Sequence, residues 1–278
     1  MFHSCQSITI GAGNVKAAWI ALLFCAALTH AAFERDAVDP VSRSLSGAGL
    51  ALDRMGGFAQ NPALASPRML GIRWEQPYGA RELTSEMAAV AFPIRGWCGA
   101  ATFEQTGDEV YREQRAVALA NYAVQPDLRV GLAAQWSALA IQGLPDGSAA
   151  TLTVGLQGRL SQDLAGAVVW RNPLRAKLSR YEDRLPTLLA AGLAFAADDN
   201  TTFVLDAAQE PGWPVELRGG VQMRILKPLT LRAGARFDPA EYSTGFSLKH
   251  RSLNFHYALS WHRELGATHG LGLDFQWR

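Results

Sequence analysis

Large apolar residues alternate with small or polar ones along much of the second half of the chain. In residues 252–262 the large apolar side chains fall on every second position: Leu253, Phe255, Tyr257, Leu259 and Trp261. The same period of two runs through residues 150–160, 214–225, 229–237 and 268–277. Successive side chains of a β-strand point to opposite faces. Each stretch is therefore predicted to be a strand with one apolar and one polar face.

Strands are predicted to follow one another from about residue 68 to the end, because no segment there has a helical period and turn signals recur throughout. The strands that we expect, about fourteen in number, span residues 69–76, 85–94, 97–106, 113–124, 128–141, 150–160, 164–171, 186–196, 201–208, 214–225, 229–237, 241–249, 252–262 and 268–277. No stretch after the N-terminus has the ~18 unbroken apolar residues of a membrane-spanning helix.

The connections between these strands alternate between long and short through most of the chain. The long connections are residues 77–84, 107–112, 142–149 and 172–185, and the short ones are residues 95–96, 125–127, 161–163 and 197–200. Outer-membrane barrels have short periplasmic turns and longer extracellular loops. The fold class predicted from the sequence is therefore all-β, a transmembrane antiparallel β-barrel of about fourteen strands.

Alternating strands also build soluble proteins, so a periplasmic two-layer β-sandwich that binds a ligand is the competing fold. Large aromatic residues near the strand ends favour the membrane barrel, because such barrels carry aromatic girdles at both interfaces. These residues are Trp97, Trp136, Trp170, Tyr242, Trp261 and Trp277.

Residues 1–32 have the features of a secretory signal peptide. Lys16 precedes an apolar run at residues 17–28, and small residues at Thr29 and Ala31 precede a cut near Ala31 or Ala32. We therefore expect the chain to be exported. Of the three cysteines only Cys98 lies beyond this segment, so neither a disulfide nor a cysteine metal site is expected.

Residues 33–67 form a separate zone before the predicted barrel of residues 68–278. The zone is rich in Gly and Pro, which argues against a long helix or a regular strand. It nevertheless contains large apolar residues: Leu45, Leu50, Leu52, Met55, Phe58 and Leu64. The zone is therefore expected to be packed against another part of the chain.

The same zone resembles the N-terminal signature of FadL-like outer-membrane barrels, and among them of the PorV/PorQ group. The matching residues are Arg43, Gly47, Ala48, Ala51, Asp53, Asn61, Pro62 and Ala63, with Leu64 where the group usually has Gly. The resemblance implies that residues 33–67 are a plug inside the barrel. It also implies the outer membrane of a Gram-negative-type bacterium, and transport or protein secretion with a hydrophobic small molecule or a secreted cargo protein as partner.

Four arginines fall on the polar faces of two adjacent predicted strands, where they are expected to face the lumen: Arg218, Arg224, Arg232 and Arg236. One role for them is to attract an anionic group of a ligand, such as a carboxylate. Charges in a narrow plugged lumen need partners, so the interpretation that we favour is internal pairing. The candidate partners are Glu216, Asp206, Asp274 and Asp53.

Asn254 and His256 share a polar strand face with Ser260 and are further candidates for the lumen. A barrel hydrolase built from these three residues is a weaker alternative, because neighbours on one strand face lie about 7 Å apart, too far for direct hydrogen bonds. We therefore predict a protein without catalytic residues, cofactor or metal.

The net charge of +1 gives no argument for nucleic-acid binding. The partners that we expect are outer-membrane lipid and the transported molecule, with the barrel present as a monomer. A purely structural, permanently plugged barrel is the remaining alternative to transport.

A heat-modifiability gel tests the barrel directly. Folded membrane barrels resist SDS until they are boiled, so the protein is expected in the outer-membrane fraction with a different mobility before and after heating. A protein that stays soluble and shows no shift would favour the β-sandwich.

Overall fold

The structure is a computed structural model and describes residues 32–33, 35, 39–54, 56–179, 184–237 and 239–277. The signal peptide predicted for residues 1–32 lies outside the described residues except for Ala32. Residues Ala32–Arg278 form one compact unit.

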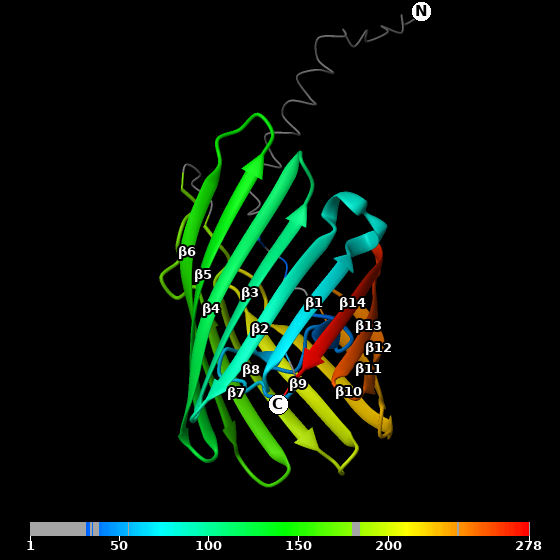
Figure 1. The fold of residues 1–278 in the computed structure, drawn as a ribbon. Coiled ribbons are helices and arrows are strands. Elements are labelled where there is room, and N and C mark those ends of the chain that lie inside the picture. Colours follow the sequence, from blue (N-terminus) through cyan, green and yellow to red (C-terminus); the bar gives the residue numbers. More distant parts are fainter. Residues whose placement is uncertain are drawn as a thin grey trace, which may run out of the picture. The chain divides into compact units, whose positions relative to one another are not determined.

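Fourteen strands in the described part of the chain close into one antiparallel barrel (Figure 1). Each strand pairs with its neighbours in sequence, and β1 closes the ring by pairing with β14. The strands are β1 (Met69–Gln76), β2 (Ser85–Ile94), β3 (Trp97–Gly107), β4 (Tyr111–Gln125), β5 (Leu128–Ile141), β6 (Gly147–Arg159), β7 (Leu164–Arg171), β8 (Leu188–Ala196), β9 (Thr201–Gln209), β10 (Glu216–Leu226), β11 (Leu229–Phe237), β12 (Glu241–His250), β13 (Leu253–His262) and β14 (Gly266–Gln276). The predicted all-β barrel is confirmed, and the sandwich alternative is wrong.

Most strand bounds agree with the prediction to within two residues, but β6 begins three residues earlier than expected, at Gly147. The first residues of β6 are small and carry no apolar alternation, so the sequence pattern does not reveal them. They are nevertheless paired with β5, where Leu139 is opposite Gly147. Strands β4, β5 and β6 consequently extend beyond their neighbours at the upper end of the barrel in Figure 1.

The outer face of the barrel is apolar. Side chains such as Ile72 and Leu132 are 58% and 53% exposed although they lie in the middle of their strands. Five of the six aromatic residues expected in the girdles are exposed on the same face: Trp97, Trp136, Trp170, Tyr242 and Trp261. In a soluble protein so much exposed apolar surface would be unfavourable. On a membrane barrel the lipid covers it.

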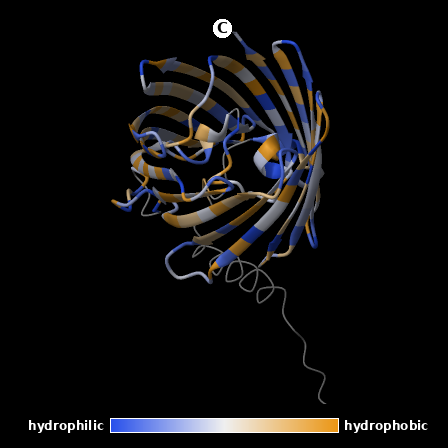
Figure 2. Ribbon diagram, turned by 90° about the horizontal axis from the view of Figure 1, so that it is seen from below, coloured by the Kyte–Doolittle hydropathy of each residue, from blue (hydrophilic) through white to orange (hydrophobic). Residues whose placement is uncertain are grey.

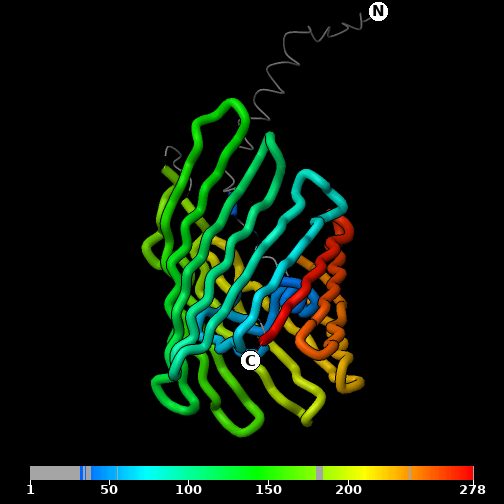
Figure 3. Tube along the Cα trace, viewed as in Figure 1, coloured from blue at the N-terminus to red at the C-terminus, as the bar shows by residue number. Residues whose placement is uncertain are grey.

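The described residues of 39–66 lie inside the ring of strands, where Figures 2 and 3 show them crossing the lumen. We call them the inner segment. It contains the short helix α2 (Pro40–Arg43) and the 3-10 turn η2 (Gly57–Ala59). Leu45, Phe58 and Leu64 are at most 2% exposed, so the apolar side chains of this Gly- and Pro-rich stretch are buried within the barrel.

The lumen has two kinds of wall. The apolar wall is formed by small and aliphatic side chains of β2–β5 and β7–β9: Met87, Ala89, Ala91, Ala100, Leu119, Ala133, Ala167, Val169, Leu188, Ala190, Ala194, Val204 and Ala208. The polar wall, on β10–β14 and β1, buries Arg73, Glu75, Arg232, Glu241, His256 and Asp274. Strands β3, β4 and β9 also bury a few charged groups among their apolar ones: Glu104, Glu113, Arg115 and Asp206. Leu45, Leu50 and Leu52 pack on the apolar wall through one cluster, and Phe58 through another.

Two further 3-10 turns, η3 (Pro77–Gly79) and η4 (Arg81–Leu83), form the connection between β1 and β2. Among the described residues, no helix has the length and apolar character that crossing a bilayer requires.

Two leucines with equal exposure give a test of which surface meets lipid. Leu132 lies within β5 on the outer face, Leu144 lies in the loop after β5, and both are 53% exposed. Leu132→Arg is expected to lower the free energy of unfolding in lipid vesicles by about 2–4 kcal/mol, because it places a charge in hydrocarbon. Leu144→Arg is expected to leave it unchanged within about 0.5 kcal/mol. Equal effects of the two substitutions in denaturant titrations would contradict a lipid-facing outer surface.

Candidate functional site in the barrel lumen

Side chains of the wall hold the backbone of the inner segment. On β9 the Asp206 carboxylate oxygen Oδ2 accepts hydrogen bonds from the backbone nitrogens of Gly49 (2.7 Å) and Leu50 (3.0 Å). On β4 the Asn121 amide nitrogen donates to the carbonyls of Pro62 and Leu64, both at 2.9 Å. The two hydrogen bonds to the Asp206 carboxylate are charge-assisted and therefore among the stronger ones. Together the two anchors hold two distant turns of the inner segment.

Asn61 stabilises the predicted Asn61-Pro62-Ala63 motif from within. Its Oδ1 atom accepts from the Ala63 backbone nitrogen at 2.9 Å, which closes a local Asx-type turn. Its Nδ2 atom donates to the carbonyl of Leu50 at 3.0 Å and to that of Leu156 on β6 at 3.3 Å. One amide thereby shapes its own turn and joins that turn to the rest of the inner segment and to the wall.

The other motif residues lie in the first turns of the inner segment. Gly47 has a φ of 85°, in the left-handed region that favours glycine. Its carbonyl accepts from the Gln60 side chain at 2.9 Å. Ala48 is fully buried in the apolar cluster. These positions require small residues because the chain turns tightly against the wall.

Glycines of the wall let the inner segment approach the barrel backbone directly. A Cβ atom at Gly234 on β11 would lie 2.6 Å from Leu45 Cα. Cβ atoms at Gly131 and Gly155 would collide with Pro62 and Asn61. Because Gly234 and Gly131 face backbone atoms rather than flexible side chains, a larger residue there would have to displace the chain.

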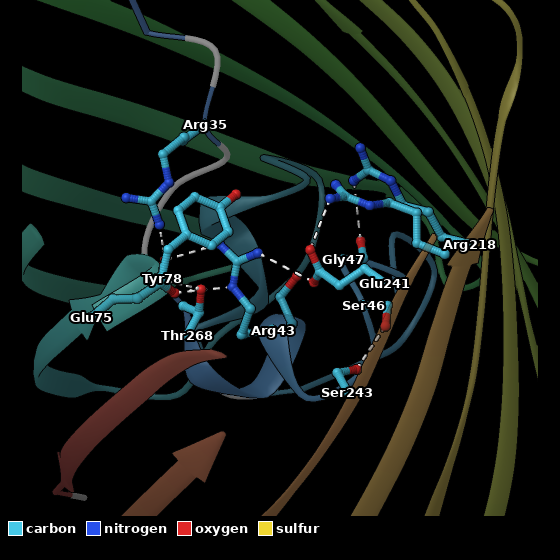
Figure 4. Close-up of polar contacts among 12 residues, drawn as sticks. Arg35, Arg43, Ser46, Gly47, Glu75, Tyr78, Arg218, Glu241, Ser243 and Thr268 are labelled. Atoms are coloured by element: carbon cyan, nitrogen blue, oxygen red, sulfur yellow. Dashed lines mark hydrogen bonds and ion pairs between the residues drawn. The ribbon is translucent and has the colours of Figure 1, made fainter. Parts of the chain in front are cut away.

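A network of ion pairs joins Arg43 of the inner segment to the polar wall (Figure 4). Arg43 Nη2 lies 2.9 Å from Glu75 Oε1 on β1, and Nη1 lies 3.6 Å from Glu241 Oε1 on β12. Arg236 on β11 also binds Glu241, at 2.8 Å. Arg218 pairs with Glu216, which is 3.7 Å from Arg236. Arg43 therefore belongs to a chain of alternating charges that runs from β1 to β10.

A second polar row crosses the wall through six neighbouring strands. Its members, in spatial order, are Arg73, Asp274, His256, Ser247, Arg232 and Gln222. The two ring nitrogens of His256 are both engaged, Nε2 with Asp274 (3.0 Å) and Nδ1 with Ser247 (2.6 Å). The Ser247 hydroxyl also accepts from Arg232 at 2.6 Å. His256 thus bonds across strands, and not to Asn254 or Ser260 on its own strand as the hydrolase alternative required.

Most of the residues that the sequence predicts to face the lumen do so. Arg218, Arg232 and Arg236 face the lumen, whereas Arg224 is exposed near the short-turn end of β10. Asn254 is buried on β13. Of the partners considered from the sequence, Glu216 pairs with two of the arginines, whereas Asp274 pairs with Arg73 and Asp206 binds backbone nitrogens.

Sequence reasoning did not single out Arg73, Glu75, Asn121 or Glu241. All four occupy inward positions of their strands, so the alternation marks them as lumen-facing. Their partners come from distant strands or from the inner segment, and this pairing depends on how the barrel closes.

Asp39 caps the start of α2 and is buried beside Arg54. Its carboxylate accepts from the backbone nitrogens of Val41 and Ser42, each at 3.3 Å. Burial by itself raises the pKa of Asp39, but Arg54 and Arg73 outweigh this effect, so the pKa lies below its ordinary value. The stability that this carboxylate contributes is present above its unfolded-state pKa and is lost as pH falls through the folded-state pKa.

A cavity of about 280 Å³ remains between the inner segment and the wall. One part of its lining is apolar: Phe33, Phe58, Val117, Leu119, Ala133 and Leu188. The other part is polar and mostly charged: Arg35, Arg43, Glu104, Arg115, Glu216, Arg218 and Arg236. An apolar surface facing fixed hydrogen-bonding groups is typical of sites for small molecules.

Solved structures with the same fold exist for other proteins. No family model and no curated protein matches the sequence. The CymD monoaromatic hydrocarbon channel superposes with a TM-score of 0.66 at 14% identity, over 89% of this chain and 99% of that chain. The Pseudomonas putida toluene transporter TodX gives 0.64 at 12%, over 87% and 97%. A Pseudomonas aeruginosa FadL homologue gives 0.60 at 9%, over 89% and 100%. The chain has the fold of these barrels.

Gly234→Ala tests how tightly the inner segment is held. The new Cβ would lie 2.6 Å from Leu45 Cα, so we expect the contact between inner segment and wall to weaken by about 1–3 kcal/mol. Hydrogen exchange followed by mass spectrometry should show faster exchange in the peptide around Leu45. Gly99→Ala is the matched control, because a Cβ at Gly99 meets nothing within 4 Å. Unchanged exchange in Gly234→Ala would show that the segment is not held there.

Proposed function

We propose that the protein is an outer-membrane channel that takes up small hydrophobic or amphipathic molecules. The observation that carries this proposal is the cavity of about 280 Å³ between the inner segment and the wall of a transmembrane barrel. CymD is a monoaromatic hydrocarbon channel, and TodX is a toluene transporter. Their shared fold supports the proposal without naming the ligand of this chain.

The two-sided lining suggests what such a ligand looks like. Val117, Leu119 and Ala133 offer an apolar surface, while Arg218 and Arg236 on the facing wall already share Glu216 as an ionic partner. A molecule with an apolar body and at most one polar group fits this arrangement best. The basic residues then orient the polar end, while burial of the apolar body contributes most of the binding free energy.

Passage requires the inner segment to move, because it crosses the lumen and contacts both walls. Its anchors are individual hydrogen bonds and ion pairs, which water or a ligand can replace. Secretion of a cargo protein, the other role implied by the resemblance to the PorV/PorQ group, receives less support, since a cavity of about 280 Å³ suits a small molecule.

The form of the barrel supports a proposal for the location and assembly of the protein. Short turns at the end where β14 finishes and longer loops at the other end give the arrangement of outer-membrane barrels in Gram-negative-type bacteria. Ring closure pairs every strand edge, so no partner subunit is needed to cover an edge. We therefore propose a monomer surrounded by outer-membrane lipid.

Neighbouring alanines on β5 allow a sharp test of transport. Ala133 is 6% exposed and lines the cavity, whereas Ala134 is exposed on the outer face. Ala133→Phe is expected to lower the protein-dependent part of uptake of radiolabelled toluene by intact cells, because the new ring occupies a large part of the cavity. Ala134→Phe is expected to retain uptake, since its ring points into lipid.

The heat-modifiability gel must show that both variants fold, because a larger side chain in a packed interior costs stability. Wild-type cells that take up toluene no faster than cells without the protein would argue against a channel for this class of molecule. Uptake that persists unchanged in Ala133→Phe would place the pathway elsewhere. A barrel that stays impermeable even after deletion of residues 39–66 would support the purely structural alternative.

A further inference from the structure

The first described residues of the chain lie inside the barrel, next to a buried carboxylate. The backbone nitrogen of Phe33 donates a hydrogen bond to Glu113 Oε1 on β4 at 2.9 Å. Phe33 is only 6% exposed. Ala32, the preceding residue, packs beside it against the same cluster of side chains. The nitrogen of Ala32 is therefore one residue away from a nitrogen that already contacts Glu113.

The Phe33 side chain is held in a pocket of its own. Its ring packs with Leu139 of β5 and with Leu178 and Leu185 of the connection between β7 and β8. The guanidinium of Arg115 lies over the ring, 5.4 Å from its centre. Arg115 also donates to the carbonyl of Arg35 at 2.8 Å. Four contacts of different kinds thus fix the position of the chain at this point.

Within the described part of the chain, the guanidinium that pairs with Glu113 is shared with a second carboxylate. Arg115 lies 3.5 Å from Glu113 and 3.8 Å from Glu104, and all three side chains are at most 10% exposed. Tyr111 donates its hydroxyl to Glu113 at 2.5 Å but carries no charge. Two carboxylates therefore share one guanidinium, because Arg35, the other described cation near Glu104, is itself paired with Glu75. Buried charges are costly unless they are well paired, so an additional cation beside Glu113 would be favourable.

We propose that the chain is cut between Ala31 and Ala32 and that the new ammonium of Ala32 supplies this cation, ion-paired with Glu113 inside the lumen. A signal peptidase hydrolyses the peptide bond with water, leaving a carboxylate on Ala31 and an ammonium on Ala32. Thr29 and Ala31 are the small residues that such a cut requires. The mature N-terminus then lies in the upper lumen, held by charge and by the Phe33 ring. This arrangement does not depend on what the barrel transports.

The experiment measures both the cut and the environment of the amine. The protein is purified folded from the outer-membrane fraction, and its first residue is determined by intact mass and N-terminal sequencing. The α-amine is then labelled with an amine-reactive reagent, once in the folded barrel and once after boiling. We expect Ala32 as the first residue, and labelling about tenfold or more slower in the folded barrel, because a charge-assisted hydrogen bond must be broken first.

Two variants separate an ion pair from simple burial. Glu113→Gln keeps the shape of the side chain but removes its charge, so labelling in the folded barrel should approach the rate of the boiled protein. Glu109→Gln removes an exposed charge from the neighbouring loop and should behave like the wild type. Each variant is first shown to fold by heat-modifiability.

A first residue other than Ala32 overturns the proposal. So does an amine that reacts equally fast in the folded and boiled wild type, a comparison that decides the question even if Glu113→Gln does not fold. Protection that persists in folded Glu113→Gln also overturns it, because burial alone would then explain the slow labelling.

Discussion

Ring closure by hydrogen bonding between β1 and β14 is the constraint on which the rest of the structure depends. In hydrocarbon an unpaired backbone nitrogen or carbonyl costs several kcal/mol (~4–8 kcal/mol for a group without any partner). Pairing Met69–Gln76 with β14 removes the last free edges. Once the ring is closed, every strand must have one face in lipid and the other in the lumen. The large apolar residues then lie outside, and the charged residues are left inside.

Those inward charges create the next requirement, which the inner segment meets together with the wall. Arg43 joins Glu75 and Glu241, Asp206 accepts from two backbone nitrogens, and Asn121 donates to two carbonyls. The inner segment therefore does not only occupy the lumen, because its polar groups pair with the charged and amide side chains of the wall. Its leucines pack where the wall is apolar, so the division of the lumen into two kinds of wall sets the orientation of the segment.

The cavity lies where these two kinds of wall meet, which gives it both an apolar and a charged surface. A channel for small amphipathic molecules needs such a combination, because an apolar lining provides affinity and polar groups provide orientation. The contacts that hold the inner segment are distributed over several strands. Movement of the segment would therefore change the cavity and its ionic partners together.

The sequence by itself determined the strands, their inward and outward faces and the order of long and short connections. These features depend on local alternation, which has a period of two whatever the rest of the chain does. The early start of β6 was missed because small residues carry no such signal. Only the tertiary structure decided which charges meet, such as Arg73 with Asp274 or Glu113 with the nitrogen of Phe33. Such partners are far apart in the chain, and their distance is set by ring closure and by the path of the inner segment through the lumen.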